Sequence, residues 1–305
     1  MLHKFAHFLI HRAKNRGPIR LIMTLLVKNE ADIIADNIRV HHNLGVDGFA
    51  VMDNGSTDGT LDLLQQLKDE GINIHIIHQP AQDYQQAKWM TELAFYARDK
   101  MGADMVISND ADEFYIPKNG CDLRAYFSRK DSVVTVRRYN MALDDRAMQP
   151  GYQYWDGDLK VINPIFYDKS AQLKQDAVSM LLVKISPKAI VNPYGLFRLK
   201  GGNHRANHVW RLISKRDEAD IEVIHFPIRS YEQFERNIIN RKRLIETTNA
   251  RMGDHYRRWV RLYDEGKLRD EFQKFLLSQN DIDTLCRLGV ISKESYRNTI
   301  SIKKN

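Results

Sequence analysis

Short apolar runs alternate with amphipathic helical stretches in the first third of this 305-residue chain, and this alternation constrains the fold most. The apolar runs cover residues 19–27, 48–52, 72–77 and 104–109. The stretches with helical spacing of apolar residues lie between them, at 31–44, 61–70 and 87–101. Strands that are separated by helices of this length form a parallel sheet with right-handed crossovers. The sequence therefore predicts an α/β fold with a mostly parallel sheet flanked by helices.

Polar and acidic residues follow several of these predicted strands. They include Asp53, residues 79–85 and residues 110–113. In open α/β sheets, ligands bind outside the carboxyl ends of the parallel strands, which meet at one edge. We therefore expect a ligand site where these residues converge.

The rest of the chain has a different pattern. Shorter strand-like pieces occur at 132–136, 181–185, 189–191 and 221–226. Beyond residue 230 the spacing of apolar residues is helical. The pattern predicts three parts. They are a basic N-terminal helix over 1–17, an α/β domain over 18–230 and a helical C-terminal extension over 231–305.

The acidic triplet Asp110-Ala111-Asp112 follows the fourth apolar run. In a continuing strand, residues i and i+2 point to the same side, so both carboxylates would approach one cation. Such hard oxygen ligands suit Mg²⁺ or Mn²⁺ bound together with substrate phosphates. Glu113 adds a third carboxylate, and three neighbouring acids repel each other unless a cation is present. A simple acidic turn is the alternative interpretation.

The segment from Asp53 to Thr60, DNGSTDGT, joins a predicted strand to a predicted helix. Its glycines permit a tight turn, and its serine, threonine and aspartate residues favour helix N-caps. It lacks the glycine patterns of dinucleotide-binding and Walker-type ATP sites. The Asp53 carboxylate is placed to accept hydrogen bonds from a base or ribose, and a purely structural capped turn is the alternative.

Composition excludes several classes of protein. The cysteines Cys121 and Cys286 are far apart, which argues against a disulfide framework or a cysteine-based zinc site and favours a reducing, cytoplasmic compartment. No apolar run has the roughly 18 residues of a transmembrane helix. The N-terminal segment lacks the pattern of a signal peptide. Two interpretations of it remain open, a helix docked on the protein and a helix lying peripherally on an anionic membrane.

The formal net charge of +7 indicates an anionic partner, such as nucleotide phosphates, anionic lipid or nucleic acid. Much of the excess lies between Arg241 and Arg261. A solvated helix face explains this cluster as simply as a binding surface does.

Four motifs in this order resemble glycosyltransferase family 2. They are LLVKNE at 25–30, DNGSTDGT at 53–60, NDADEF at 109–114 and HFPIRS at 225–230. The resemblance covers residues 19–245 and is strongest to a bacterial branch with D-N-x-S-x-D-G-T, D-A-D-E-F and a late H-[FY]-P-x-R-S. It implies a GT-A fold and a metal-dependent enzyme that uses a nucleotide-activated sugar, expected to be UDP-linked.

The resemblance also assigns roles to single residues. It implies that Glu30 and Asp53 contact the base and ribose, and that Asp110 and Asp112 hold Mn²⁺ or Mg²⁺ and the diphosphate. It makes His225 a further metal or diphosphate ligand, with a buried core histidine as the alternative. The lysines Lys28 and Lys88 become possible diphosphate contacts, or ordinary surface lysines.

The catalytic base is the least determined residue. Enzymes of this family generally invert the anomeric centre, which requires a group that deprotonates the acceptor hydroxyl. The family's usual Glu-Asp pair is not evident in this sequence. The candidates are Asp156, Asp158, Asp176 and His204. We favour His204 as a site residue because the two glycines before it let the backbone approach a ligand closely.

The resemblance implies a saccharide or lipid-linked acceptor and a role in bacterial surface polysaccharide synthesis. Two other functions remain open. A sugar-phosphate nucleotidyltransferase would need a Gly-rich basic loop after the first strand, where this chain has Lys28-Asn29-Glu30. A non-catalytic anion- or nucleic-acid-binding protein would fit the charge, but no recognised nucleic-acid-binding motif accompanies it, so we expect no specific nucleic acid partner.

Overall fold

The computed structural model describes residues 2–13, 17–80, 85–165, 180–201, 203–209, 215–247 and 254–301. The chain forms two compact units. Unit 1 comprises Met1–Ala81, Gln85–Arg138 and Ser186–Ile224, and unit 2 comprises Gln82–Tyr84, Tyr139–Ile185 and His225–Asn305. The division falls within one strand and directly before the last residue of another, so each of these strands has residues in both units.

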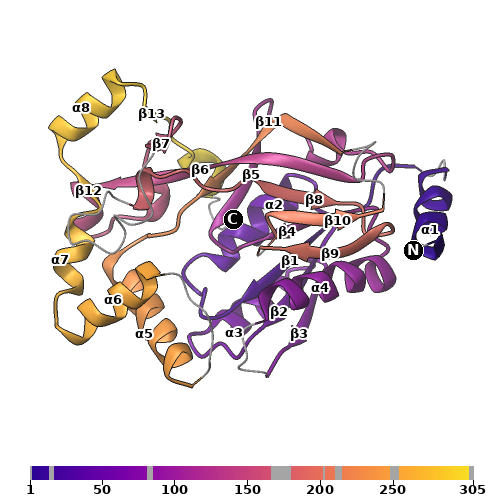
Figure 1. The fold of residues 1–305 in the computed structure, drawn as a ribbon, viewed down its shortest axis with the longest axis horizontal. Coiled ribbons are helices and arrows are strands. Elements are labelled where there is room, and N and C mark those ends of the chain that lie inside the picture. Colours follow the sequence, from indigo (N-terminus) through magenta and orange to yellow (C-terminus); the bar gives the residue numbers. More distant parts are fainter. Residues whose placement is uncertain are drawn as a thin grey trace. The chain divides into compact units, whose positions relative to one another are not determined.

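A mostly parallel sheet forms the centre of unit 1 (Figure 1). Its parallel strands are β1 (Leu21–Val27), β2 (Gly48–Asp53), β3 (Ile74–His78) and β4 (Met105–Asn109). They lie in the order β4-β1-β2-β3. Two antiparallel strands extend it beyond β4, first β8 (Lys188–Val191) and then β6 (Val133–Asp144). The predicted mostly parallel sheet is confirmed.

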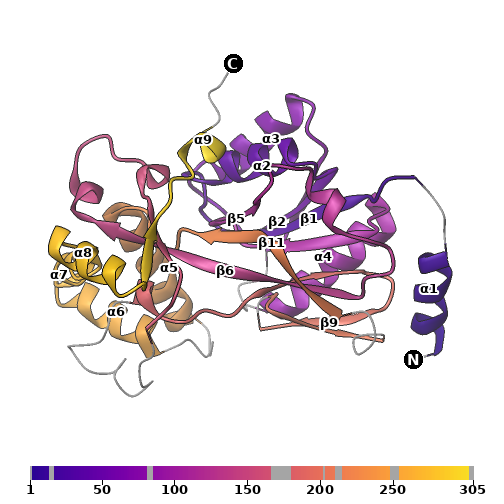
Figure 2. The ribbon, with the colours of Figure 1, turned by 90° about the horizontal axis from the view of Figure 1, so that it is seen from above.

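Three helices connect the parallel strands, namely α2 (Ile34–Asn43), α3 (Thr60–Asp69) and α4 (Gln86–Met101). The buried face of α4 packs on Ile22, Ala50 and Val106, which come from three neighbouring strands. The helices α2 and α3 contact each other on the opposite face (Figure 2). Helices on both faces explain why the central strands β1, β2 and β4 are buried along nearly their whole length rather than alternating between buried and exposed residues.

Strand register brings the predicted ligand residues to one edge. Val27 pairs with Asp53, and Asp53 pairs with His78. On the other side of β1, Leu25 pairs with Asn109. The segments that follow β1, β2, β3 and β4 therefore leave the sheet at the same edge, as the sequence predicted.

The acidic triplet itself differs from its prediction. Strand β4 ends at Asn109, and Asp110 to Asp112 form a tight turn before β5 (Glu113–Pro117). The amide of Glu113 donates to the carbonyl of Asp110 at 3.1 Å, which closes the turn. The prediction that both aspartates extend a strand is wrong, because the chain reverses immediately after the last β4 residue.

The remaining elements of unit 1 surround this sheet. They are α1 (Leu2–Ala13), the 3₁₀ turn η1 (Leu123–Tyr126), β9 (Leu196–Lys200), β10 (Arg205–His208) and the part of β11 (Lys215–His225) up to Ile224. β9 and β10 form an antiparallel pair, and β11 pairs with β5 and β6. α1 packs on unit 1 through the buried side chains of Phe8 and His11. Within the described residues, no helix is both long and apolar enough to cross a membrane.

Unit 2 contains mainly helices and short strands. Its helices are α5 (Tyr231–Thr247), α6 (Asp254–Asp264), α7 (Leu268–Gln273), α8 (Gln279–Arg287) and α9 (Arg297–Ile300). Its short elements are η2 (Asp145–Met148), η3 (Tyr154–Asp156), β7 (Leu159–Val161), η5 (Met180–Leu182), β12 (Leu276–Leu277) and β13 (Ile291–Lys293). β13 pairs with β7, and both β7 and β12 pair with β6. The helical C-terminal part matches the sequence prediction.

The packing of unit 2 divides the chain differently from the expected boundary after residue 230. Leu143 and Leu181 pack in one apolar cluster with Phe234 and Phe272 of the C-terminal helices. Residues 139–185 therefore belong with those helices. The strand predicted over 181–185 is also wrong, because Met180–Leu182 is a 3₁₀ turn, and a short apolar run cannot be assigned to a strand by periodicity alone.

Candidate active site

Two buried asparagines hydrogen bond to the backbone carbonyls of the acidic turn. The Asn37 amide of α2 donates to the carbonyls of Ala111 and Glu113, at 2.9 and 2.8 Å. The Asn109 amide donates to the same Glu113 carbonyl at 3.1 Å and to the Asn37 side-chain oxygen at 3.2 Å. Asn37 and Asn109 are both fully buried. These bonds satisfy the turn's inward-facing carbonyls and fix its conformation.

Two buried cations face the carboxylates of the turn. Glu113 is fully buried, and Arg138 Nη1 donates to its Oε1 at 2.6 Å. Lys188, also fully buried, lies 2.7 Å from the other oxygen of Glu113 and 2.5 Å from Oδ2 of Asp110. The sequence argument that three acids require a bound cation overlooked these side chains. The protein supplies two cations of its own.

Strand pairing explains how Lys188 reaches the turn. In the antiparallel pair of β4 and β8, Val106 lies opposite Val191 and Ile107 opposite Ile190. The same register carries Lys188, at the start of β8, to the end of β4 where the acidic turn begins. A lysine that adjoins an apolar strand pattern was the available sequence signal, but it did not indicate a partner.

Burial and neighbouring charge act in opposite directions on Asp110. Burial raises the pKa of its carboxyl group, the positive charge of Lys188 lowers it, and the negative charges of Glu113 and Asp112 raise it again, with a net raised pKa. With all groups ionised, the three carboxylates and the two cations Lys188 and Arg138 leave one net negative charge.

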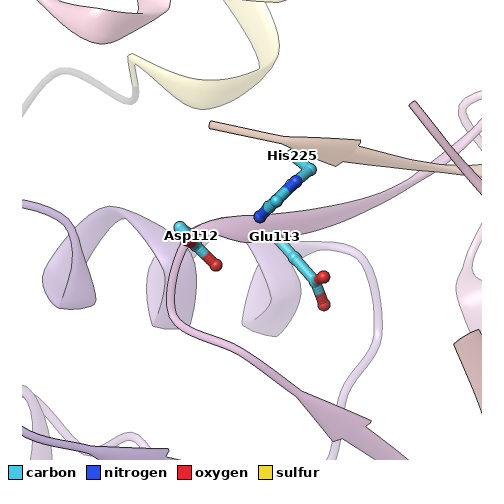
Figure 3. A group of neighbouring side chains, drawn as sticks. All are labelled: Asp112, Glu113 and His225. Carbon is cyan, nitrogen blue, oxygen red and sulfur yellow. The ribbon is translucent and has the colours of Figure 1, made fainter. Parts of the chain in front are cut away.

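Asp112, Glu113 and His225 form a candidate metal-binding group. Each offers one ligand atom, and these atoms all lie within 4.8 Å of one another. Figure 3 shows the His225 ring pointing from the end of β11 towards the two carboxylates. Among the described residues, this group of histidine and acidic side chains does not include Asp110, which faces Lys188 instead. Asp112 and His225 are thus brought together as predicted, but the role of Asp110 as a metal ligand remains a prediction.

The donor set fits a divalent ion that is shared with a substrate. Carboxylate oxygens with one imidazole nitrogen suit Mn²⁺ and are acceptable to Mg²⁺. The Glu113 charge is already compensated by Lys188 and Arg138, so the single net negative charge of the cluster falls short of balancing a divalent ion. Phosphate oxygens of a bound nucleotide would provide the rest, as is usual for Mg²⁺ sites.

The two loops that carry Glu30 and Asp53 are tied together by hydrogen bonds. The Asn29 side-chain oxygen accepts from the backbone amide of Thr57 at 2.8 Å, and the backbone amide of Asn29 donates to the Ser56 hydroxyl at 2.9 Å. Asp53 is 2% exposed, and its carboxylate accepts from the amides of Gly55 and Ser56. The structure therefore gives Asp53 a structural role in its own turn, and its nucleotide contact stays a prediction.

Glu30 and Lys28 flank the same loop and are both half-buried. The Glu30 amide donates to the Thr60 hydroxyl at 2.9 Å, and its carbonyl accepts from Ile34 at the start of α2. The expected side-chain N-cap of the helix after the 53–60 segment is wrong, because Gly59 is the N-cap residue of α3; Asp58 instead accepts from the amides of Ala31 and Thr60.

His204 lies in unit 1 in the turn between β9 and β10. Its Nδ1 is 3.0 Å from the Pro187 carbonyl, so Nδ1 carries the proton and Nε2 keeps its lone pair. Burial first, and then the positive charges of Lys188 and Arg138, lower the pKa of His204 to about 4. The preceding Asn203 contacts the acidic turn, since its amide lies 3.4 Å from Asp110 Oδ1 and its oxygen accepts from Lys188 at 2.7 Å. Asn203 was not predicted from the sequence.

The other candidate bases lie in unit 2. Asp156 caps η3 by accepting from the Gln153 amide at 3.0 Å, and it pairs with Arg297 at 3.0 Å. Asp158 pairs with Arg146. Asp176 lies outside the described residues. The contacts of Asp156 and Asp158 give them structural roles and do not test a catalytic one.

Lys88 lies in the first turn of α4 and lines a cavity of about 760 Å³. This cavity also includes Arg198 and Arg205 of the β9–β10 pair. Lys88 thus lies in a basic cavity, and its contact with a diphosphate stays a prediction.

Solved structures of glucosyl-3-phosphoglycerate synthase from Mycobacterium tuberculosis resemble this chain. The complex with Mn²⁺, UDP and glucosyl-3-phosphoglycerate is 18% identical over 44% of this chain and 48% of that chain, with a TM-score of 0.27. The complex with Mn²⁺, UDP and phosphoglyceric acid is 15% identical over 61% and 60%, with a TM-score of 0.29. The matches thus span less than two thirds of the synthase chains. No curated protein sequence matches this chain significantly.

The family model of glycosyl transferase family 2 matches residues 24–184, which is more than half of the 305-residue chain. The match contains the β1, β2 and β4 edge segments and the whole acidic turn. The chain belongs to glycosyl transferase family 2.

Proposed function

We propose that this protein is a metal-dependent glycosyltransferase that moves a sugar from a nucleotide-sugar donor to an acceptor hydroxyl. The observation that carries the proposal is the acidic turn at the carboxyl edge of a parallel sheet, with Asp112, Glu113 and His225 close enough to share one cation. Membership of glycosyl transferase family 2 supports the reaction class.

The acidic turn would serve the departing diphosphate. Asp112 and His225 would hold Mn²⁺ or Mg²⁺, which when bound neutralises charge on the leaving group. Lys188 and Arg138 stabilise Glu113 and Asp110 in ionised form beside it. The buried asparagine contacts keep the turn rigid, so the ligands need no reorganisation when the donor binds.

Glu30 and Asp53 would lie beside the base and ribose of the donor, with Lys28 near the phosphates. The interlocked loops support this assignment, because the hydrogen bonds between Asn29 and Thr57 hold both segments at the carboxyl edge.

His204 is the candidate base that the geometry favours. Its Nε2 is the unprotonated nitrogen, and Asn203 connects its turn to Asp110. The lowered pKa, about 4, keeps the ring neutral near pH 7, as a proton acceptor must be, although it also makes the ring a weaker base. Asp156 is the second candidate. Direct proton removal from the acceptor would accompany inversion at the anomeric carbon.

The finer parts of the proposal concern substrate and place. We propose a UDP-linked donor, a saccharide or lipid-linked acceptor and a role in bacterial surface polysaccharide synthesis. We also propose a cytoplasmic protein with peripheral membrane contact. The exposed Leu9 and Ile10 of α1, 40% and 59% exposed, support that contact.

A thermal-shift screen tests the transferase proposal. UDP-, GDP-, CMP- and dTDP-sugars are added to the protein with and without Mn²⁺. We expect stabilisation by one nucleotide class only when the metal is present. If none of them stabilises the protein with Mn²⁺, the proposal is wrong.

Asp112→Asn gives the matching test of the site. It should abolish the Mn²⁺-dependent shift, whereas Asp62→Asn, at an exposed position of α3, should retain it. Equal behaviour of the two variants would place the metal elsewhere. Product formation from the responding donor then distinguishes transfer from simple binding.

A further inference from the structure

A basic cavity in unit 1 includes none of the residues of the candidate metal-binding group, and of the residues predicted to contact the nucleotide it includes only Lys88. It is bounded by the first turns of α4 and by the β9–β10 pair and has a volume of about 760 Å³. Four of its lining residues are cationic, and one is acidic. The cations are Lys88, Arg198, Lys200 and Arg205, and the acid is Glu92.

These cations have no carboxylate partner within the described part of the chain. The ion pairs of the described residues include none of the four, although most other arginines of unit 1 are paired in this way. α4 has no acidic residue in its first turn, so the partial positive charge of its N-terminus adds to the field. Unpaired cations that gather around a cavity favour an anionic ligand.

The cavity is built on a rigid frame. The Thr91 hydroxyl of α4 accepts from the amide of Leu199 in β9 at 2.9 Å, and both residues line the cavity. The two residues are also buried. The helix and the hairpin that carry the cations are therefore fixed to each other at the cavity itself.

The β9–β10 turn connects this cavity to the acidic turn. Gly201 lines the cavity, and Asn203, two residues later, hydrogen bonds to Lys188 and contacts Asp110. Asn203 is fully buried and has a left-handed φ of 77°, which fixes the course of the turn. His204 follows it directly. The β9–β10 segment that lines the cavity therefore also carries the candidate base and a residue that contacts the acidic turn.

We propose that this cavity binds an anionic group, a phosphate or carboxylate, of the acceptor substrate. The proposal rests on the transferase function proposed above and adds the substrate class. The donor diphosphate has its own partners in the acidic turn and its metal, so it does not require a second cluster of four cations. The guanidinium groups of Arg198 and Arg205 suit a phosphate monoester because each can donate two parallel hydrogen bonds.

The test uses glycerol 3-phosphate as the anionic probe and glycerol as its uncharged control. Binding to the 305-residue protein is measured by calorimetry with UDP and Mg²⁺ present at saturation, so that the donor site is filled. We expect glycerol 3-phosphate to bind and glycerol not to bind. Arg198→Glu and Arg205→Glu should each weaken the binding at least about tenfold.

Matched variants and a second ligand make the result specific. Lys130→Glu, at an exposed position outside the cavity, should keep wild-type binding of glycerol 3-phosphate. UDP affinity in the presence of Mg²⁺ should change less than about twofold in both arginine variants. The two arginines are exposed, so we expect the wild-type melting temperature to be retained within a few degrees.

Three outcomes would overturn the proposal. The first is no binding of glycerol 3-phosphate, and the second is equal binding by the wild type and both arginine variants. The third is an equal loss of UDP and glycerol 3-phosphate binding, which would assign the cavity to the donor. Failure of the transferase proposal has a different signature, since UDP would then not bind with metal even to the wild type.

Discussion

Nδ1 of His225 lies 2.7 Å from the side-chain oxygen of Asn140, and this hydrogen bond determines which ring nitrogen is available to a metal. The Asn140 amide nitrogen donates to the Leu181 carbonyl at 3.0 Å, so the amide oxygen must face the histidine. Nδ1 therefore carries the proton, and Nε2 keeps its lone pair. A hydrogen bond of this kind orients a metal-binding histidine and raises its basicity.

Removing this bond should weaken metal binding. We expect Asn140→Leu to reduce the apparent affinity for Mn²⁺ about 10- to 100-fold, measured from the Mn²⁺ dependence of UDP binding. Asn140→Asp keeps an oxygen acceptor and should retain most of the affinity. Equal Mn²⁺ dependence in the wild type and Asn140→Leu would show that His225 does not act as a ligand.

The Lys188 ammonium is predicted to stabilise the acidic turn. Lys188→Met leaves the fully buried Glu113 with Arg138 alone and should lower the free energy of unfolding by about 3–5 kcal/mol, since a buried charge loses a partner. Glu113→Gln in the same chain should recover part of the loss, because it removes the uncompensated charge. Urea unfolding of the two single variants and the double variant gives the coupling energy. If the two effects add to within about 0.5 kcal/mol, the pair is not coupled.

The sheet and its ligand edge were predictable because their signals are local. An apolar run, a glycine after a helix and an acidic turn after a strand are each visible within a few residues, and right-handed crossovers then order the strands. The placement of Asp53 and the acidic turn at the same edge could therefore be predicted from local patterns alone, without long-range contacts. The helical C-terminal part was predictable for the same reason.

The partners of the acidic turn were not predictable, because they come from distant segments. Lys188 lies 78 positions from Asp110, and Arg138 lies 25 positions from Glu113, on strands whose register the sequence does not state. Asn37 is equally inconspicuous, since a polar residue in a predicted helix is normally exposed. The sequence also did not indicate that residues 139–185 belong with the C-terminal helices, because this depends on the packing of Leu143 and Leu181 against helices from the end of the chain.

Substitutions of Asn29 should show how much its hydrogen bonds stabilise the two loops that carry Glu30 and Asp53. Its φ is 59°, in the left-handed region, and its side chain accepts from Thr57. Asn29→Ala loses the hydrogen bond and strains the backbone, and should cost about 2–3 kcal/mol of unfolding free energy. Asn29→Gly loses only the bond and should be more stable than the alanine variant by about 1 kcal/mol. Identical urea midpoints for the two variants would contradict the role of the left-handed conformation.

Protonation of His41 should make the stability of the protein depend on pH. His41 is fully buried in α2, its Nε2 accepts from the Tyr115 amide at 2.9 Å, and its Nδ1 donates to the Asn37 carbonyl at 2.7 Å. The bond from Tyr115 requires an unprotonated Nε2 and therefore the neutral ring, whereas the bond to Asn37 only requires a proton on Nδ1. Burial lowers the pKa of His41 to about 4, although the Asn37 carbonyl and the charge of Glu113 oppose the shift.

The sign of the effect follows from proton binding. Between about pH 6.5 and pH 4 the unfolded chain binds a proton at His41 that the native protein does not, so stability falls as the pH falls through this window. Above about pH 6.5 the contribution is complete. The full loss at pH 4 is about 3 kcal/mol for this one residue. Burial also lowers the pKa of His208 to about 4, so His208 adds to the fall in the same window.

Urea unfolding at pH 7.5, 6 and 5 measures this dependence. His41→Gln should be less stable than the wild type at pH 7.5, but its unfolding free energy should fall less steeply as the pH falls. The reason is that the variant takes up fewer protons on unfolding than the wild type, by up to about one. His42→Gln, at the exposed neighbouring position, should keep the wild-type slope. A His41→Gln slope equal to that of the wild type would mean that the native protein accommodates a protonated His41, and would contradict the neutral ring that holds Tyr115 next to the acidic turn.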